Sequence, residues 1–251
     1  MTSESFSLVT WNLALGGPSN QAPASVDSQT NLFAILDEID RHDPDFICLQ
    51  EMPTQGFVHY LSDRYVSGQV VPSHSGFSAV FVRRGPIANH EIQLDSQLSL
   101  PPATGVSLQI GEEQLLIFSL HLFPTKANAP QRLQFLSSFL PQVRASQPLL
   151  IAGDFNMREV ETEAVTALGL RDAYQQWDDP DRKLYATWDS IVNLFHDNRY
   201  PFRARYDRVF YRNLQLQDYQ LLGRTPIELA GSSYYLSDHF GIYAEFSFET
   251  E

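Results

Sequence analysis

Eight polar residues adjoin apolar, strand-like segments of the 251-residue chain, where a hydrophobic core has no use for them. They are carboxylates, carboxamides and imidazoles. Charged groups beside apolar strands cost free energy unless they are paired or bind a metal, so their recurrence at six strand ends predicts one shared site. In chain order they are Asn12, Glu51, His121, Asp154, Asn156, Asp207, Asp238 and His239.

The ligand types in this set indicate which metal it would hold. Carboxylate and amide oxygens dominate, and cysteine is absent from the set. Such a hard, oxygen-rich site suits Mg²⁺, with Mn²⁺ as the alternative, whereas zinc sites contain more His or Cys. Any single member has a simpler explanation, because Asp and Asn commonly cap helices or start turns.

Two other catalytic classes are disfavoured by missing motifs. The chain has no Gly-x-Ser-x-Gly sequence, which argues against a serine nucleophile at a strand-to-helix turn. It also lacks Gly-x-x-x-x-Gly-Lys, which excludes a P-loop nucleotide hydrolase.

The elements that must position the eight residues are mainly strands, indicated by apolar runs and alternation. Helical spacing occurs at Leu32, Phe33, Leu36 and Ile39, and again around Leu133 to Val143 after Pro130. The clearest strands are 6–11, 45–50, 77–82, 115–122, 149–152, 206–211 and 241–248, and further antiparallel strands are expected at 65–71, 87–94, 105–110 and 215–222.

About ten to twelve strands with few helices are too many for a simple doubly wound sheet. They predict an α/β fold, a four-layer α/β/β/α sandwich of two packed, mainly antiparallel sheets with outer helices. No linker or low-complexity segment divides the chain, so residues 1–251 are expected to form a single catalytic domain.

The net charge of −13 offers no general attraction to nucleic acid, so any phosphate must be met locally. One stretch inverts this sign, with Asp207 as its only acid between residues 198 and 213. It is either a phosphate-facing patch or a solvated face. Its basic residues are Arg199, Arg203, Arg205, Arg208 and Arg212.

Cys48 is the only cysteine, which excludes an intramolecular disulfide and is typical of a reducing compartment. The N-terminus has no basic leader, and no run of 18 uncharged apolar residues occurs. We therefore expect a cytoplasmic monomer, or a nuclear one in a eukaryote, without a membrane span.

Six short motifs contain the polar residues, and they resemble those of the endonuclease/exonuclease/phosphatase superfamily, in the same order across nearly the whole chain. The resemblance implies a four-layer sandwich and metal-dependent attack of water on a phosphate ester. The motifs are Thr10-Trp11-Asn12, Leu49-Gln50-Glu51, Ser119-Leu120-His121, Gly153-Asp154-Phe155-Asn156, Tyr206-Asp207-Arg208 and Ser237-Asp238-His239.

Three longer segments, 153–158, 186–189 and 205–212, look like the 5′-tyrosyl-DNA phosphodiesterase branch of that superfamily. One position departs from the branch, which usually has Asp two residues after the first motif's Asn, where this chain has Ala14. The departure implies that a secondary metal contact is missing.

The resemblance also implies a role for each motif residue. Glu51 would be the direct metal ligand. Asn12 would lie beside it, donate a hydrogen bond to the phosphate and make a further contact with the metal. Asp154 would orient or deprotonate the water, and Asn156 would point to the same face. Asp238 would reach the metal through water.

The two histidines of the motifs would act on the phosphate. His121 would contact a phosphate oxygen, and His239 would face the phosphate while Asp207 accepts its other ring proton. The five remaining histidines match no motif and are interpreted as surface or loop residues. They are His42, His59, His74, His90 and His196.

Four residues are candidates for substrate binding. Arg158 and Trp188 would hold the substrate strand and stack on a base, although a solvated Arg and a Trp that closes the core explain them as well. Arg205 and Arg208 belong to the basic stretch described above.

Three hypotheses on function follow. The first is a phosphodiesterase that removes 5′-phosphotyrosyl or other 5′-end adducts from DNA or RNA. The second keeps the chemistry but changes the substrate to other DNA or RNA, a phospholipid or an inositol phosphate. The third is an inactive binding module, which Ala14 could indicate.

Overall fold

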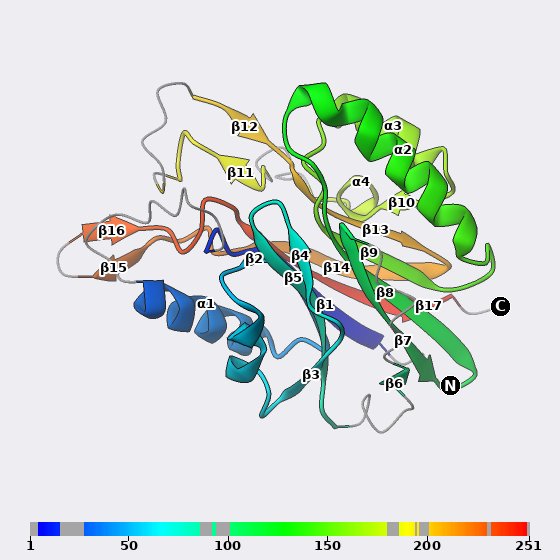
Figure 1. Ribbon diagram of the computed structural model, residues 1–251, viewed down its shortest axis with the longest axis horizontal. Helices are drawn as coiled ribbons and strands as arrows, with labels where there is room; N and C mark the ends of the chain where they lie inside the picture. Colours follow the sequence, from blue (N-terminus) through cyan, green and yellow to red (C-terminus); the bar gives the residue numbers. More distant parts are fainter. Residues whose placement is uncertain are drawn as a thin grey trace.

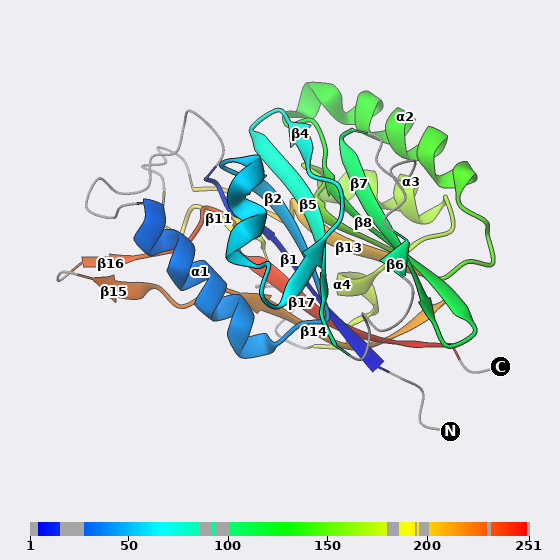
Figure 2. The same ribbon diagram turned by 60° about the horizontal axis from the view of Figure 1, so that its bottom comes forward.

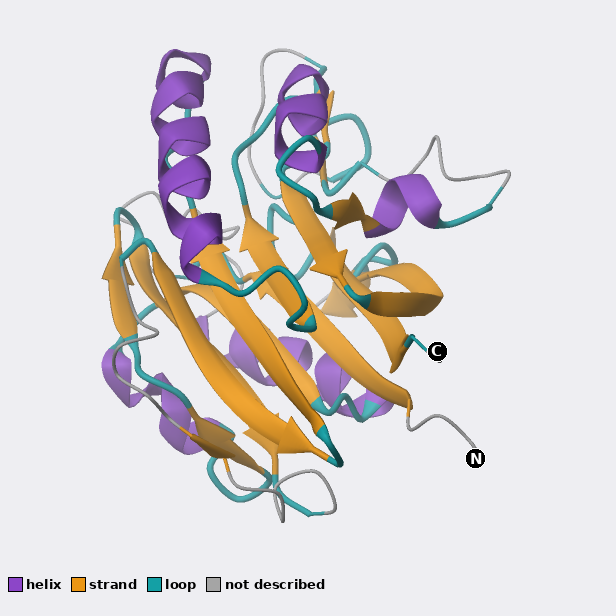
Figure 3. Cartoon of the chain, turned by 90° about the vertical axis from the view of Figure 1, so that its right-hand side faces the viewer, coloured by secondary structure: helices purple, strands orange, loops and turns teal. Residues whose placement is uncertain are grey.

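A computed structural model of the chain describes residues 5–15, 28–85, 92–93, 101–179, 186–193, 195, 201–229 and 232–249. Two sheets pack face to face, and Figures 1 and 2 place helix α1 on one side of the strands and α2 and α3 on the other. Seen from the right-hand side of Figure 1, helices lie on both outer faces (Figure 3). The predicted four-layer sandwich is confirmed.

The first sheet has seven strands in the order β14-β17-β1-β2-β5-β3, with β4 paired to β5. Strands β1 and β2 are parallel, and every other pair in this sheet is antiparallel. The strands are β1 (Ser5–Asn12), β2 (Phe46–Met52), β3 (Tyr65–Ser67), β4 (Val71–Ser73), β5 (Gly76–Arg83), β14 (Leu214–Leu222) and β17 (Gly241–Phe248).

The second sheet has six strands in the order β10-β13-β9-β8-β7-β6. Only β8 and β9 are parallel in it. The strands are β6 (Ile92–Gln93), β7 (Ala103–Ile110), β8 (Glu113–His121), β9 (Leu149–Asp154), β10 (Arg171–Asp172) and β13 (Asp207–Arg212).

Two short hairpin-like sheets and the helices complete the described part. The small sheets pair β11 (Trp188–Asp189) with β12 (Arg203–Ala204), and β15 (Ile227–Leu229) with β16 (Ser232–Tyr234). The helices are α1 (Ser28–His42), α2 (Ala129–Phe139), α3 (Glu159–Thr166) and α4 (Ala173–Gln176), with 3-10 turns η1 (Gln55–Tyr60), η3 (Lys126–Asn128) and η4 (Leu140–Gln142). None of the described helices is long and apolar enough to cross a membrane.

Three apolar clusters hold the layers together, and β1 shows how one strand serves two of them. Leu8 faces the space between the sheets, whereas Val9 faces α1, because successive side chains of a strand point to opposite faces. The third cluster joins α2 to the second sheet through Leu136 and Ile151. Central strands are therefore buried on both faces, which explains their continuous apolar runs.

Several details differ from the sequence expectations. Phe33, predicted on the buried stripe of α1, is 51% exposed and packs edge-on against Tyr60. The strand expected at 65–71 is two short strands, and of the one expected at 87–94 only 92–93 lies within the described residues. Helices α3 and α4 were not predicted, because each is short and shows little apolar periodicity.

The strand directions bring the polar motifs to one rim. Parallel pairing places the end of β1 beside that of β2 and sets His121 opposite Asp154 on β8 and β9. Asp207 begins β13 and His239 precedes β17, so both come before their strands, not after them as predicted. Antiparallel pairing brings a strand's start to the rim where its neighbour ends, and Asp207 accordingly lies opposite Asp154.

Gly153, next to Asp154, is required by the close approach of β9 to β8. Its φ of 136° is in a region that side chains rarely adopt, and a Cβ there would lie 2.1 Å from the Leu120 carbonyl oxygen. Neither backbone can yield without disturbing the parallel pairing that aligns His121 with Asp154.

We expect Gly153→Ala to lower the free energy of unfolding by more than about 3 kcal/mol, because backbone strain and a backbone clash add together. Gly85→Ala is the matched control, since Gly85 has a similar φ of 126° but open space around it. In the control, the free energy of unfolding should fall only by the cost of backbone strain, about 1–2 kcal/mol. Urea denaturation of both variants measures the difference, and equal losses would contradict the clash.

Candidate active site

The ends of β1, β2 and β9 bring Asn12, Glu51 and Asp154 into contact. The Asn12 amide nitrogen donates to Glu51 Oε1 at 3.2 Å and to Asp154 Oδ2 at 3.0 Å. Its amide oxygen accepts from the Ala14 N–H at 3.0 Å. One carboxamide thus holds two carboxylates at a fixed separation.

Glu51 is turned toward the rim by an irregularity in β2. Its φ of 54° is unusual for a side chain other than glycine, and the register with β5 shifts between Leu49 and Met52. The Ser75 hydroxyl donates to Glu51 Oε1 at 2.8 Å. Burial raises the pKa of the Glu51 carboxyl, and the charge of Asp238 adds to the rise.

Asp207 and His239 form a buried pair, in which His239 Nδ1 lies 2.7 Å from Asp207 Oδ2. The Asp207 N–H donates to the Thr187 hydroxyl at 3.0 Å, which fixes the start of β13. His239 Nε2 points toward Asp154, 3.9 Å from its Oδ2. This is the pairing that the family resemblance implied.

The charges in this group shift one another's pKa. Burial and the neighbouring Asp207 raise the pKa of Asp154 to about 7. Burial alone would lower the pKa of His239, but the carboxylates of Asp207 and Asp238 outweigh it and raise that pKa well above its ordinary value. These carboxylates therefore favour the protonated form of His239.

Trp11 connects the first motif to the last. Its indole N–H donates to the His239 carbonyl oxygen at 2.9 Å, and the ring is almost completely buried. A Cβ at Gly223 or Gly241 would come within 2.6 Å or 2.8 Å of that ring. Close packing around Trp11 thus sets the position of the loop that carries His239.

Asp238 and Asn156 complete the predicted set. Asp238 Oδ1 lies 3.9 Å from His239 Nε2, near enough to act on Glu51 as well. Asn156 has a φ of 52° and donates its N–H to Asp154 Oδ1 at 2.8 Å, while its amide donates to the Leu122 carbonyl oxygen at 3.1 Å. All eight residues therefore lie in one region of the rim.

His121 is buried beside these carboxylates and is accompanied by residues that were not predicted. Its Nδ1 lies 3.2 Å from the Ser73 hydroxyl, and its ring lies 4.0 Å from that of His74 between centroids. Burial lowers the pKa of His121 well below its ordinary value, and the nearby His74 and His239 lower it further. Ser73, His74 and Ser75 match no motif, so the sequence does not identify them. The turn between β4 and β5 brings them to the site.

Arg158 and Trp188 flank the site. The Arg158 guanidinium donates to the Asn156 carbonyl oxygen at 2.9 Å and lies over the Tyr206 ring, 5.1 Å from its centroid. Trp188 is half-buried, bridges to His239 through the backbone, and lies 5.9 Å from the ring of Phe202, which is 46% exposed. Together they form an aromatic, basic border next to His239.

Arg205 and Arg208, which were predicted to bind substrate, are buried and pair with acidic side chains of the protein. Arg205 donates to both Asp172 oxygens at 2.8 Å and to Glu159 at 2.8 Å. Arg208 is buried and donates to Thr162 at 2.8 Å and to Asp172 at 3.1 Å. Both guanidiniums are consumed by buried ion pairs, because a buried charge must be compensated.

The rest of the basic stretch is also dispersed. Arg203 pairs with Asp189 at 2.8 Å, and Arg212 donates to the Arg144 carbonyl oxygen at 2.9 Å. Arg199 lies outside the described residues. Each described arginine of the basic stretch therefore has a partner within the protein.

The residues present fit a divalent cation. Two groups have ligand atoms within 4.8 Å of one another, Glu51 with His74 and His121, and Asp154 with Asp207 and His239. Among the described residues, His121 Nε2 and Asp207 Oδ1 are buried without a hydrogen-bond partner. Closely spaced buried carboxylates of this kind require a positive partner.

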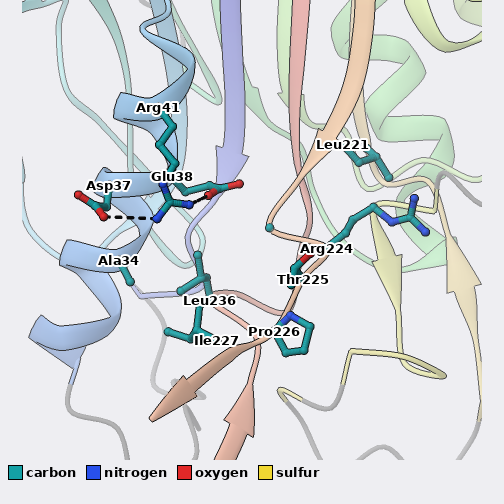
Figure 4. Close-up of a pocket in the computed structure, with 11 residues that line it drawn as sticks. Ala34, Asp37, Glu38, Arg41, Leu221, Arg224, Thr225, Pro226, Ile227 and Leu236 are labelled. Atoms are coloured by element: carbon teal, nitrogen blue, oxygen red, sulfur yellow. Dashed lines mark hydrogen bonds and ion pairs between the residues drawn. The ribbon is translucent and has the colours of Figure 1, made fainter.

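A cavity of about 340 Å³ lies elsewhere, between α1 and the segment that joins β14 to β15 (Figure 4). Arg41 crosses one side of it and pairs with Glu38 and, at 3.4 Å, with Asp37. Its lining contains none of the predicted site residues. We assign the chemistry to the rim, not to this cavity.

Comparisons with known proteins identify relatives of this chain. Tyrosyl-DNA phosphodiesterase 2 of Xenopus tropicalis is 26% identical over 262 residues, which cover 96% of this chain and 66% of that protein. The chain thus spans just under two thirds of the length of that relative.

Two solved structures share the fold. The crystal structure of Danio rerio TDP2 complexed with single-strand DNA product has a TM-score of 0.73 and 21% identity, covering 97% of this chain and 99% of that one. The structure of the human Nocturnin catalytic domain with bound sulfate anion has a TM-score of 0.69 and 21% identity, and the match covers 98% of this chain and 95% of that one. The sequence profile of the Endonuclease/Exonuclease/phosphatase family matches residues 9–239, and the chain belongs to that family.

Proposed function

We propose that this protein is a metal-dependent phosphodiesterase that hydrolyses 5′-phosphotyrosyl or other 5′-end adducts on DNA or RNA. The observation that carries the proposal is the contact of Asn12 with both Glu51 and Asp154, beside the Asp207–His239 pair. Two further facts support the substrate class: the Xenopus relative is named a tyrosyl-DNA phosphodiesterase, and the Danio rerio structure contains a single-strand DNA product.

Glu51, with Asn12 and Asp238 beside it, would hold Mg²⁺ or Mn²⁺. A divalent cation there neutralises charge that develops on the phosphate oxygens. Glu51 is suited to this position because its carboxylate is held by Ser75 and Asn12 at the end of β2. Ala14 supplies only a backbone N–H to Asn12, so its side chain adds no ligand.

Asp154 is the group proposed to orient and deprotonate the attacking water. The Asn156 N–H holds Oδ1 and the Asn12 amide holds Oδ2, so the carboxylate has one fixed orientation. A base held in this way acts on a water within hydrogen-bond reach. The neighbouring His239 Nε2, 3.9 Å from Oδ2, would face the phosphate.

The Asp207–His239 pair would stabilise negative charge on the phosphate. Asp207 engages Nδ1, which leaves Nε2 directed at the substrate. A phenol leaving group has a pKa of about 10, well below that of an alkyl alcohol. Release of tyrosine therefore needs no strong general acid.

The border formed by Arg158 and Trp188 would receive the nucleic acid. Trp188, Phe202 and Tyr206 present aromatic rings within 6.4 Å of one another between centroids. Base stacking on such rings tolerates any sequence. With a net charge of −13, the protein would accept a short single-stranded end more readily than a long duplex.

Asp154→Asn should lower kcat on a 5′-phosphotyrosyl oligonucleotide by about 10³-fold or more, with little change in KM, because the amide cannot accept the water's proton. Steady-state kinetics with Mg²⁺ measure both constants. Asp63→Asn is the control, because Asp63 is exposed on a turn, and this variant should leave kcat unchanged. Equal activity of the two variants would rule out Asp154 as the base.

Removal of divalent metal with EDTA should abolish hydrolysis, and added Mg²⁺ should restore it. Glu51→Gln removes the anionic ligand and should raise the Mg²⁺ concentration for half-maximal activity by about 10-fold or more. Glu113→Gln, exposed at the start of β8, is the matched control. Hydrolysis that persists in EDTA would refute the metal requirement.

Trp188→Ala should raise KM for the 5′-phosphotyrosyl oligonucleotide by about 5- to 100-fold, the loss expected for one stacked base. Hydrolysis of bis-nitrophenyl phosphate, which offers no nucleobase, should be unchanged.

A gel assay that also includes an abasic duplex and an inositol phosphate tests the substrate class. Cleavage of either in preference to the tyrosyl strand would favour the other substrates considered above.

A further inference from the structure

The turn between β4 and β5 reaches over the Glu51 side of the site. Ser73 and Gly76 are opposite each other in the pairing of the two strands, so His74 and Ser75 form the tip. The Ser75 hydroxyl donates to Glu51 Oε1 at 2.8 Å, and the Ser73 hydroxyl lies 3.2 Å from His121 Nδ1. Both neighbours of His74 in sequence are therefore tied to site residues.

His74 is consequently held close to the proposed metal ligand. Its imidazole is exposed, its ring centroid is 4.0 Å from that of His121, and a ring nitrogen lies within 4.8 Å of a Glu51 oxygen. Neither the catalytic roles nor the aromatic border described above uses this imidazole. It is a nitrogen donor at the open edge of an otherwise oxygen-rich site.

A second observation points to a ligand in this space. His121 is 1% exposed, and within the described part of the chain its Nε2 has no hydrogen-bond partner. That atom is aimed between two carboxylates, 3.7 Å from Glu51 Oε1 and 3.6 Å from Asp154 Oδ2. A buried polar atom so placed is normally satisfied by a bound group.

We propose that His74 is a nitrogen ligand of the cation held by Glu51 and that it gives the site a preference for a transition-metal ion over Mg²⁺. The inference rests on the metal site of the proposed function. Imidazole nitrogen binds first-row transition metals, whereas Mg²⁺ favours oxygen ligands and water. His74 thus adds a nitrogen donor next to the carboxylate of Glu51.

Binding of Mn²⁺, used as the probe, tests the proposal without relying on activity. The electron paramagnetic resonance signal of free Mn²⁺ gives its Kd, competition gives the Kd of Mg²⁺, and pulsed measurements detect coupling to a ligand nitrogen. In His74→Ala, we expect the Mn²⁺ Kd to rise by about 10-fold or more and the nitrogen coupling to decrease by the contribution of one imidazole, while the Mg²⁺ Kd changes less than about 3-fold.

His59→Ala is the matched control, since His59 is exposed on η1 and should leave both constants unchanged. Thermal unfolding of each variant confirms that it is folded. Wild-type protein without nitrogen coupling, or a His74→Ala variant that keeps the wild-type coupling and Kd, would overturn the proposal.

Glu51→Gln separates this failure from failure of the proposed function. If Mn²⁺ binding is lost in Glu51→Gln but unchanged in His74→Ala, the metal site of the proposed function stands and only the role of His74 is rejected. Binding unaffected by both changes would reject the metal site as well.

Discussion

Negative charge buried at one rim of the sandwich is the constraint on which the rest of the site depends. Asp154 and Asp207 lie opposite each other on the paired strands β9 and β13, and Glu51 lies near the end of β2 in the facing sheet. An apolar cluster closes the space behind them. Carboxylates so placed repel one another and lose hydration, so the fold must supply compensation. It does so with the Asn12 amide, the His239 imidazolium and, in the function we propose, a divalent cation.

The packing of the sandwich enforces this arrangement. The pairing of β1 with β2 and of β8 with β9 is parallel, whereas β13 and β17 run antiparallel to their partners. Strand ends and strand starts therefore meet at one edge. Gly153 lets β9 approach β8 closely enough for this, and side chains on both faces of each central strand lock the register.

The sequence predicted the fold and the convergence of the eight polar residues because both leave periodic or local signals. Polar residues next to strands that are buried on both faces can be recognised in the sequence, because they interrupt a continuous apolar run. The acidic partners of Arg205 cannot be recognised in this way, since Asp172 and Glu159 come from short elements without periodicity. The sequence consequently does not reveal that Arg205 and Arg208 are held in buried ion pairs with Asp172. His74 was missed for the same reason, because its position depends on how the β4–β5 turn folds over β2.

The close packing around Trp11 has a consequence for the order in which the site can form. Strand β17 pairs with β1, and the loop that carries His239 is fixed by the Trp11 indole. Asn12 and Glu51 are 39 residues apart in sequence, whereas His239 follows Asn12 by 227 residues. Bringing His239 to the rim therefore requires contact between distant parts of the chain, and such contacts form slowly because closing a long loop costs entropy.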